Sequence, residues 1–220
     1  MDTPSMDSGS RLSRELDQFL ESLGGEDSTL GALLDSIAGK GFGLLLMVLA
    51  LPAALPIPAP GYATPFGLLM VFLGSQMLVG KSQPWLPQFL RRKTLKYKTC
   101  AFAVRNSGKV LRLVEWLVRP RLSGLARNRI FLALVSLVII LMASFMILPV
   151  PLTNTAPSFV IFLLAAGMLE EDGLVLLGGL ILAPLAAFIA SLAIYYAVTY
   201  GFEAIETEVK PMIKGLLGLE

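Results

Sequence analysis

Three long stretches of the chain contain no charged residue, and they cover residues 41–80, 130–169 and 173–202. A helix needs about 20 apolar residues to cross a hydrocarbon core of about 30 Å, and each stretch is long enough. A soluble protein with three buried helices is the alternative. Charged residues make up 15% of this chain, whereas they make up about a quarter of an average soluble domain. A soluble protein would need more of them to cover its surface. The sequence therefore predicts an all-α, polytopic integral membrane protein.

Proline-rich elements interrupt the first two stretches. They read Leu55-Pro56-Ile57-Pro58 and Leu148-Pro149-Val150-Pro151. Proline has no backbone N–H to donate and its ring clashes with the preceding turn, so each element should end a helix. The arms 41–55 and 65–79 are about 22 Å long at 1.5 Å per residue, which is shorter than the hydrocarbon core, whereas 130–148 can span it. Either the prolines lie at the far interface, or the arms form a re-entrant hairpin that turns at mid-depth.

The two interrupted stretches resemble one another at an offset of 93 residues. The two Leu-Pro-x-Pro elements align at this offset, and Gly74 aligns with Gly167. Internal repeats with broken membrane helices are typical of transporters that bind their substrate near the bilayer midplane. The pattern predicts two repeated helical hairpins. The basic segment between them favours an inverted relation, although a parallel one stays open.

Residues 81–129 contain thirteen of the eighteen Lys and Arg residues and a single acid, Glu115, so their net charge is +12 on a chain of +2. By the positive-inside rule this segment is cytoplasmic. Its apolar face at 110–118, together with Trp85 and Trp116, predicts basic amphipathic helices that lie on the membrane and bind anionic lipid. This face explains the basic charge without nucleic acid, so no nucleic-acid partner is predicted.

One integral membrane domain with six segments is expected. The first 40 residues lack a secretory signal and carry amphipathic faces at 11–23 and 30–37, the second capped by Ser28 or Thr29. The stretch 173–202 should form one more transmembrane helix, kinked at Pro184. The segments are 1–40 (cytoplasmic amphipathic helices), 41–80 (first hinge hairpin), 81–129 (basic cytoplasmic segment), 130–169 (second hinge hairpin), 170–202 (transmembrane helix) and 203–220 (C-terminal tail).

Broken helices expose main-chain donors and acceptors, and polar side chains lie beside both hinges. Helix N-termini suit anions such as phosphate. Three basic residues near the interface, Lys81, Arg127 and Arg129, would supply the charge that an anionic lipid headgroup requires. The alternative is that the polar residues satisfy main-chain groups freed by proline. The candidate hinge and substrate-binding residues are Pro56, Pro58, Tyr62, Thr64, Gln76, Pro149, Pro151, Thr153, Asn154 and Thr155.

Glu170, Glu171 and Asp172 form an acidic cluster beside the second hairpin, and they are the candidate proton carrier of an antiporter. A solvated loop is the alternative, because no ionisable residue lies deep within a neutral stretch. The chain has no histidine and a single cysteine, Cys100, which excludes Ser-His-Asp, Cys-His and zinc–histidine chemistry. We therefore predict no enzymatic activity, no metal site and no cofactor.

Several motifs are specific enough to compare with known families. They are Gly41-Phe42-Gly43 leading to Leu51-Pro52-x-x-Leu55-Pro56-x-Pro58, then Gln76-x-x-x-Gly80 followed by Pro84-Trp85-Leu86-Pro87, and Arg119-Pro120-Arg121-Leu122. Together they resemble the ExoD family over roughly residues 12–200. The resemblance implies a bacterial inner-membrane protein linked to exopolysaccharide production and alkaline tolerance. It implies no particular biochemical activity, because the family has no well-established one.

We expect a membrane transport or binding protein that handles an anionic lipid at the paired hinges. A lipid-linked saccharide carrier such as undecaprenyl phosphate fits this description. The first alternative is a non-transporting organiser that recruits exopolysaccharide synthesis proteins, and the second is an ion or proton antiporter. Membrane lipids are the expected partners, and a homo-oligomer is left open.

Overall fold

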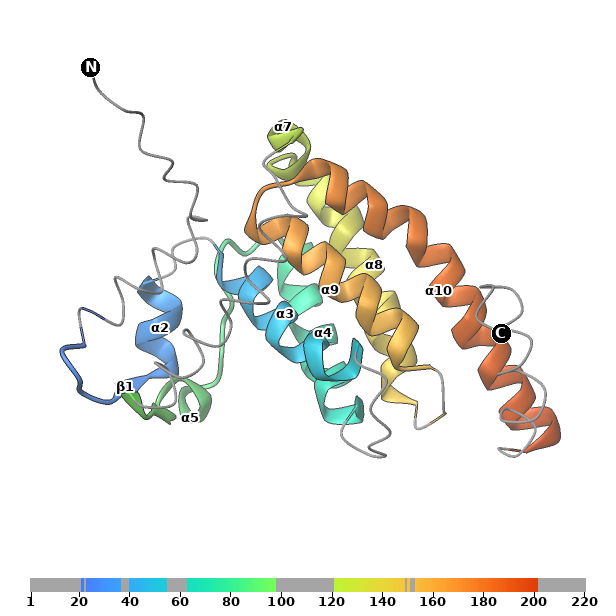
Figure 1. The fold of residues 1–220 in the computed structure, drawn as a ribbon, viewed down its shortest axis with the longest axis horizontal. Helices are drawn as coiled ribbons and strands as arrows, with labels where there is room; N and C mark the ends of the chain where they lie inside the picture. Colours follow the sequence, from blue (N-terminus) through green and yellow to red (C-terminus); the bar gives the residue numbers. More distant parts are fainter. Residues whose placement is uncertain are drawn as a thin grey trace, which may run out of the picture.

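The structure, a computed structural model, describes residues 21, 23–36, 40–54, 63–97, 121–148, 150 and 153–201. Most of these residues are helical, and the longest helices form the bundle in Figure 1. The bundle helices are α3 (Gly41–Ala54), α4 (Ala63–Leu78), α8 (Arg129–Ile147), α9 (Thr155–Leu169) and α10 (Gly173–Tyr200). The all-helical class expected from the sequence is confirmed for the described residues.

Local chemistry sets the ends of α8. The Asn128 side chain begins this helix by accepting hydrogen bonds from the backbone N–H groups of Ile130 (2.9 Å) and Phe131 (3.2 Å). The helix ends just before Leu148, which is extended (φ −75°, ψ 127°), as expected for a residue that precedes proline. The predicted break in the second stretch therefore falls where Pro149 cannot continue the helix.

Two of the described helices are long and apolar enough to cross a membrane. α8 has 19 residues with a mean hydropathy of 2.9, and α10 has 28 residues with a mean hydropathy of 2.4. At 1.5 Å per residue they are about 28 Å and about 42 Å long. The other three bundle helices are apolar but shorter, since α3, α4 and α9 have 14, 16 and 15 residues.

Large apolar side chains cover the outside of the bundle, and small residues fill many of the helix contacts inside it. Ile181 is 74% exposed and Phe188 is 58% exposed. The small buried residues of α10 are Gly173, Gly179, Ala183, Ala186, Ala190 and Ala193. Membrane helices often associate through small residues, because a hydrocarbon environment provides no hydrophobic driving force for burying large apolar side chains. This distribution is typical of a lipid-facing bundle and opposes the soluble alternative.

The two hairpins pack crosswise. α4 lies along α8, and α3 lies along α9, whereas the two arms within each hairpin contact each other less. Glycines allow the close approaches. A Cβ atom at Gly67 of α4 would lie 3.0 Å from the Ala143 carbonyl oxygen of α8, and one at Gly43 of α3 would lie 2.9 Å from Leu169 Cγ of α9. The packed core is therefore shared between the hairpins rather than contained within each.

Both hairpins point the same way. Thr64, at the start of α4, donates a hydrogen bond from Oγ1 to the carbonyl oxygen of Ile147 at the end of α8 (3.1 Å). At the opposite end of the bundle, Arg129 of α8 lies against Gly80, just after α4. We call the end with Thr64 and Ile147 the tip end, and the end with Gly80 and Arg129 the mouth end. The arms run in the same sense in both hairpins, which is not the inverted relation that the basic segment favoured.

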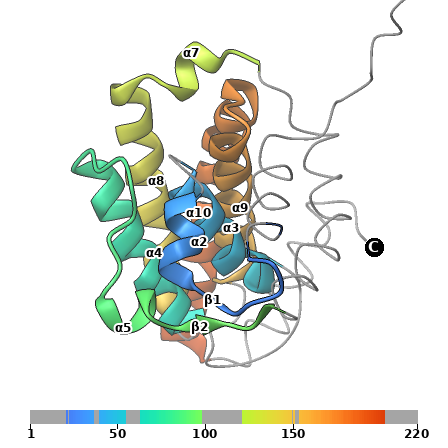
Figure 2. The same cartoon turned by 90° about the vertical axis from the view of Figure 1, so that its left-hand side faces the viewer.

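A layer of short elements covers one side of the bundle (Figure 2). It contains α2 (Leu30–Ser36), α5 (Gln88–Arg91) and the antiparallel pair β1 (Ser28–Thr29) and β2 (Thr94–Leu95), while the short α7 (Ser123–Ala126) precedes α8. Thr29 Oγ1 accepts a hydrogen bond from the Ala32 N–H (3.2 Å), which confirms the helix predicted at 30–37 and one of its candidate caps. Asp35 and Arg91 form an ion pair (2.6 Å) that joins the amino-terminal segment to the basic one.

Several predicted features lie outside the described residues. They are most of the face at 11–23, the Leu-Pro-x-Pro elements apart from residues 148 and 150, the apolar face at 110–118, and the tail from Glu203. These features stay predictions of the sequence.

Candidate functional site

Threonines at the tip end satisfy the main chain where proline interrupts it. Thr64 donates to the Ile147 carbonyl oxygen, and Thr153 Oγ1 donates to the carbonyl oxygens of Val150 (2.7 Å) and Leu148 (3.3 Å). Carbonyl groups at a helix end lack their helical partners, and Thr153, which is fully buried, replaces them. Both threonines thus satisfy main-chain carbonyl groups, which was the alternative to a role in substrate binding. The candidates Pro56, Pro58, Tyr62, Pro149 and Pro151 lie outside the described residues.

Asn154 differs from the threonines. It is the N-cap residue of α9, but its side chain makes no capping hydrogen bond. Its Oδ1 atom is buried and has no hydrogen-bond partner among the described residues. Beside it, the Thr155 carbonyl oxygen accepts a hydrogen bond from Ser158 Oγ (3.0 Å). Among the described candidates at the tip end, Asn154 therefore keeps a buried acceptor that a ligand could use.

Gln76 lies near the other end of α4, and its amide is already occupied. Nε2 donates to the Trp85 carbonyl oxygen (3.0 Å), and Oε1 accepts from the Trp85 N–H (2.6 Å). The side chain is buried, so these two hydrogen bonds hold the Pro84-Trp85-Leu86-Pro87 loop against α4. The structure does not bring Gln76 together with the hinge candidates, and the residue acts as a clamp for this loop.

The three basic candidates gather at the mouth end in three different settings. Arg127 forms an ion pair with Glu171 Oε2, with distances of 2.7 Å from Nη2 and 3.0 Å from Nε. The Lys81 ammonium lies 5.8 Å from the centre of the Trp85 ring, within cation–π range. Arg129 forms no ion pair with any acid that the structure describes. Of the three, Arg129 is therefore the cation most available to an anionic ligand.

The main chain after α4 makes room for Arg129. The Gly80 N–H donates to the Met77 carbonyl oxygen (2.8 Å) and the Lys81 N–H donates to that of Gln76 (3.1 Å), the pair of bonds that ends a helix in a Schellman motif. Gly80 has a φ of +85°, a conformation that favours glycine. A Cβ atom there would lie 3.1 Å from Arg129 Nη2. The Gln-x-x-x-Gly motif thus shapes both the end of α4 and the setting of Arg129.

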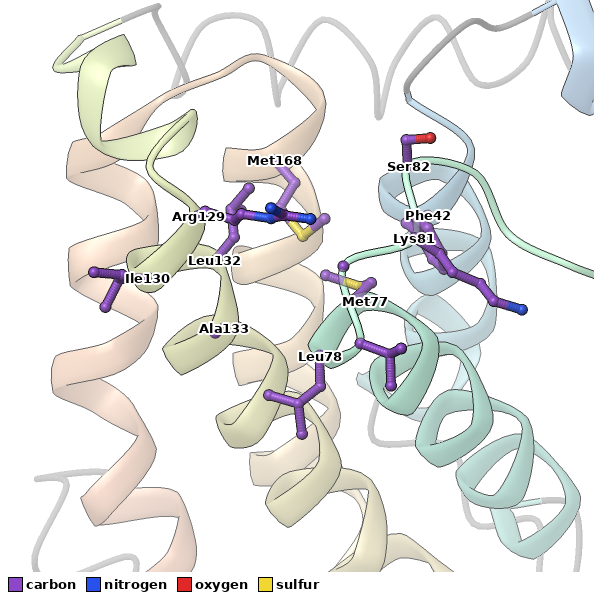
Figure 3. Close-up of a pocket in the computed structure, with 12 residues that line it drawn as sticks. Phe42, Met77, Leu78, Lys81, Ser82, Arg129, Ile130, Leu132, Ala133 and Met168 are labelled. Carbon is purple, nitrogen blue, oxygen red and sulfur yellow. The ribbon is translucent and has the colours of Figure 1, made fainter.

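A groove of about 640 Å³ opens at the mouth end, and its size is within the usual range of small-molecule sites. α3, α4, α8 and α9 contribute mostly apolar walls, which include Phe42, Met77 and Met168. Figure 3 shows the Arg129 side chain extending from α8 toward α4, while the Lys81 side chain points away from it. The apolar lining residues were missed at the level of sequence, because each reads as an ordinary residue of a membrane helix.

The acidic cluster builds the turn between α9 and α10. Asp172 is 1% exposed, and its Oδ1 caps α10 by accepting hydrogen bonds from the N–H groups of Leu174 (2.9 Å) and Val175 (3.3 Å). Glu171 holds Arg127. Neither Glu171 nor Asp172 lines the groove. The proton-carrier role of Glu170, Glu171 and Asp172 stays a prediction of the sequence. Within the described ranges, no three Asp, Glu or Cys side chains gather as metal ligands.

Replacing Asp172 by alanine is expected to lower the free energy of unfolding by about 1–2 kcal/mol, because two backbone N–H groups lose their acceptor. Asp172→Asn keeps an acceptor oxygen and should be close to wild type. The measurement is titration of the protein in detergent micelles with SDS, followed by circular dichroism. Equal losses of stability in both variants would show that the charge of Asp172, rather than its capping bonds, matters.

Comparison with known proteins connects the chain to a pathway. The family model described as "Exopolysaccharide synthesis, ExoD" matches residues 12–192. An uncharacterized protein of Synechocystis sp. is 35% identical over 197 residues, which are 89% of this chain and 93% of that protein. Protein ExoD of Rhizobium meliloti is 29% identical over 195 residues, which are 87% of this chain and 78% of that protein. No solved structure matches the chain. The sequence motifs and the family match agree, and the chain belongs to the ExoD family of exopolysaccharide synthesis proteins.

Proposed function

We propose that the chain is a multi-pass protein of the bacterial inner membrane that binds a lipid with an anionic headgroup and moves it across the bilayer. A polyprenyl phosphate that carries saccharides is such a lipid, and the family match supplies the pathway in which it would serve. The observation that carries the proposal is the groove at the mouth end. There a guanidinium without an acid partner among the described residues meets mostly apolar walls.

In this proposal the mouth end faces the cytoplasm. The basic segment 81–129 connects α4 to α8 at this end, and its excess of Lys and Arg opposes transfer across the membrane. Trp85 belongs to the same end and is 55% exposed, which suits the headgroup region. At the far end of α10, Tyr196 lies 5.8 Å from Tyr195 and 5.5 Å from Tyr200 between ring centres, an aromatic cluster suited to the opposite interface.

The two hairpins would form a structural repeat, with one hairpin related to the other by a twofold axis that runs along the bundle. The crosswise pairing supports this, since the second arm of each hairpin packs on the first arm of the other. The glycines aligned at the 93-residue offset both occupy tight positions. A Cβ atom would lie 2.9 Å from Ile140 Cγ1 of α8 at Gly74 and 2.9 Å from Leu176 Cγ of α10 at Gly167, so the two glycines pack on different partners and the crosswise pairing alone supports the repeat. In this proposal the headgroup moves along the hairpin arms from the groove toward the tip end.

A vesicle assay tests the proposed function. The full-length protein is reconstituted in phosphatidylcholine vesicles that contain polyprenyl phosphate with a fluorophore near its headgroup. A membrane-impermeant quencher is then added outside. Protein-free vesicles should lose the outer-leaflet signal alone, and vesicles with protein should lose the inner-leaflet signal too. The same protein should leave labelled phosphatidylcholine in place. Equal quenching with and without protein, together with no binding of polyprenyl phosphate, would contradict the proposal.

A non-transporting organiser is the second candidate. Arg92, Lys93 and Lys96 are exposed beside the layer formed by α2 and α5, and they present a basic surface outside the bundle. Such a surface suits an acidic protein partner of the exopolysaccharide machinery. Co-purification of a synthase that is lost when these three residues become glutamine, in a protein that moves no lipid, would favour this candidate.

A further inference from the structure

We infer that the groove at the mouth end is the site that takes the phosphate of a polyprenyl phosphate, with Arg129 as its ligand and with the lipid chain leaving over Val79 and Ile130 at the exposed rim of the groove. This inference rests on the proposed function and adds where the lipid enters and which side chain selects its charge.

Arg129 is the group in the groove best suited to bind phosphate. Its planar guanidinium can bind two phosphate oxygens at once, and hydrogen bonds between charged groups are roughly twice as strong as neutral ones. The start of α8 offers no competing site, since the first N–H groups of this helix already bind Asn128 Oδ1. Arg127, two residues earlier, is held by Glu171 and does not line the groove. The two arginines therefore make a matched pair for experiment.

The walls of the groove indicate that the anion belongs to a lipid. A free phosphate would leave Leu78, Leu132 and Met168 facing water, whereas a hydrocarbon chain would cover them. The rim continues this apolar surface outward, because Val79 is 79% exposed and Ile130 is 84% exposed. A lipid could therefore place its phosphate at Arg129 while its chain stays in contact with apolar side chains all the way to the bilayer.

Lysine and serine at the rim set the polarity of the entrance. Lys81 and Ser82 line the groove on the side of α4, and Lys81 adds a second positive charge near Arg129. Because Lys81 points away from Arg129 (Figure 3), it would attract the headgroup to the entrance rather than coordinate the same oxygens. The site should thus prefer a phosphate monoester over a zwitterionic headgroup, which brings its own cation.

The test measures binding of polyprenyl phosphate to the full-length protein in phosphatidylcholine nanodiscs. The fluorescence of a chain-labelled lipid reports binding to wild type, Arg129→Gln, Arg129→Lys and Arg127→Gln. Loss of a charged hydrogen-bond pair should weaken binding at least about tenfold in Arg129→Gln. Arg129→Lys should recover part of the affinity, and Arg127→Gln, which loses the same charge outside the groove, should remain within about twofold of wild type. Ala133→Phe, which fills the groove without changing charge, should also weaken binding.

The outcomes separate this inference from the proposed function. Equal weakening in Arg127→Gln and Arg129→Gln would mean that general surface charge attracts the lipid, and it would overturn the inference. So would displacement of the lipid by inorganic phosphate at similar concentration, which would identify a site for free anions. If Arg129→Gln binds like wild type while wild type still moves lipid in vesicles, the groove is not the site but the proposed function stands. If wild type neither binds nor moves the lipid, both fail.

Discussion

Replacing Gly67 by leucine is expected to separate α4 from α8 and to lower the free energy of unfolding by about 3 kcal/mol or more. A Cβ atom at Gly67 would lie 3.0 Å from the Ala143 carbonyl oxygen and 3.2 Å from the Ile147 backbone nitrogen. Both neighbours are main-chain atoms of a packed helix, so they cannot turn aside as a side chain could. The larger residue can be accommodated if the hairpins move apart, which opens the core that they share.

Gly178 of α10 provides the matched control, because a Cβ atom there would have no neighbour within 4 Å. Gly178→Leu should keep or slightly raise stability, since glycine within a helix costs about 1 kcal/mol relative to better helix formers. SDS titration in detergent micelles compares the three proteins. A Gly67→Leu protein as stable as wild type would show that the crosswise pairing of the hairpins is wrong.

Gln76→Leu is expected to release the Trp85 loop and to lower the free energy of unfolding by about 2 kcal/mol, because two main-chain groups lose their partner. Leucine has a similar size but can neither donate nor accept. The emission of Trp85, measured in a Trp116→Phe background so that it is the single tryptophan of the chain, should shift when the loop leaves α4.

Ser75→Ala is the control for Gln76. Ser75 is the preceding residue of α4, it is exposed, and its hydroxyl donates to the Val71 carbonyl oxygen of its own helix (2.8 Å). Its replacement should change neither the Trp85 emission nor the stability by more than about 0.5 kcal/mol. Unchanged emission in Gln76→Leu would mean that the loop is held by other contacts, such as the edge-to-face packing of Trp85 on Phe72 (6.0 Å).

The helices could be predicted from the sequence because their signals are local. Charge-free length predicted α8 and α10, and proline predicted the break after α8. Position before an apolar face left Ser28 and Thr29 as candidate caps, and the structure shows Thr29 in this role. The relative direction of the two hairpins was not predictable in the same way, because similar sequences can form either an inverted or a parallel repeat. The contacts of Thr64 with Ile147 and of Gly80 with Arg129 decide it.

The candidate binding residues stay predictions, but the structure shows where each described one lies. Lys81 and Arg129 do lie together at the groove, but Gln76 and Asp172 proved to bind the chain itself. The signal for Asp172 was present, since an aspartate just before an apolar helical stretch is a preferred N-cap. The signal for Gln76 was weaker: a polar residue four positions before glycine at a helix end does not reveal which loop returns to meet it. The groove depends on four helices meeting, which no local pattern encodes.

The helices of the bundle differ greatly in length, and this has a consequence for the surrounding lipid. α10 is about 42 Å long, whereas α3 and α9 are about 21 Å and about 22 Å. No single bilayer thickness fits both, so α10 must tilt or the membrane must thin locally beside the short arms. If the membrane thins there, a headgroup that the protein moves along these arms, as we propose, would cross less hydrocarbon than one in the unperturbed bilayer. Longer acyl chains in the host membrane should therefore slow its passage, even though they touch no residue of the groove.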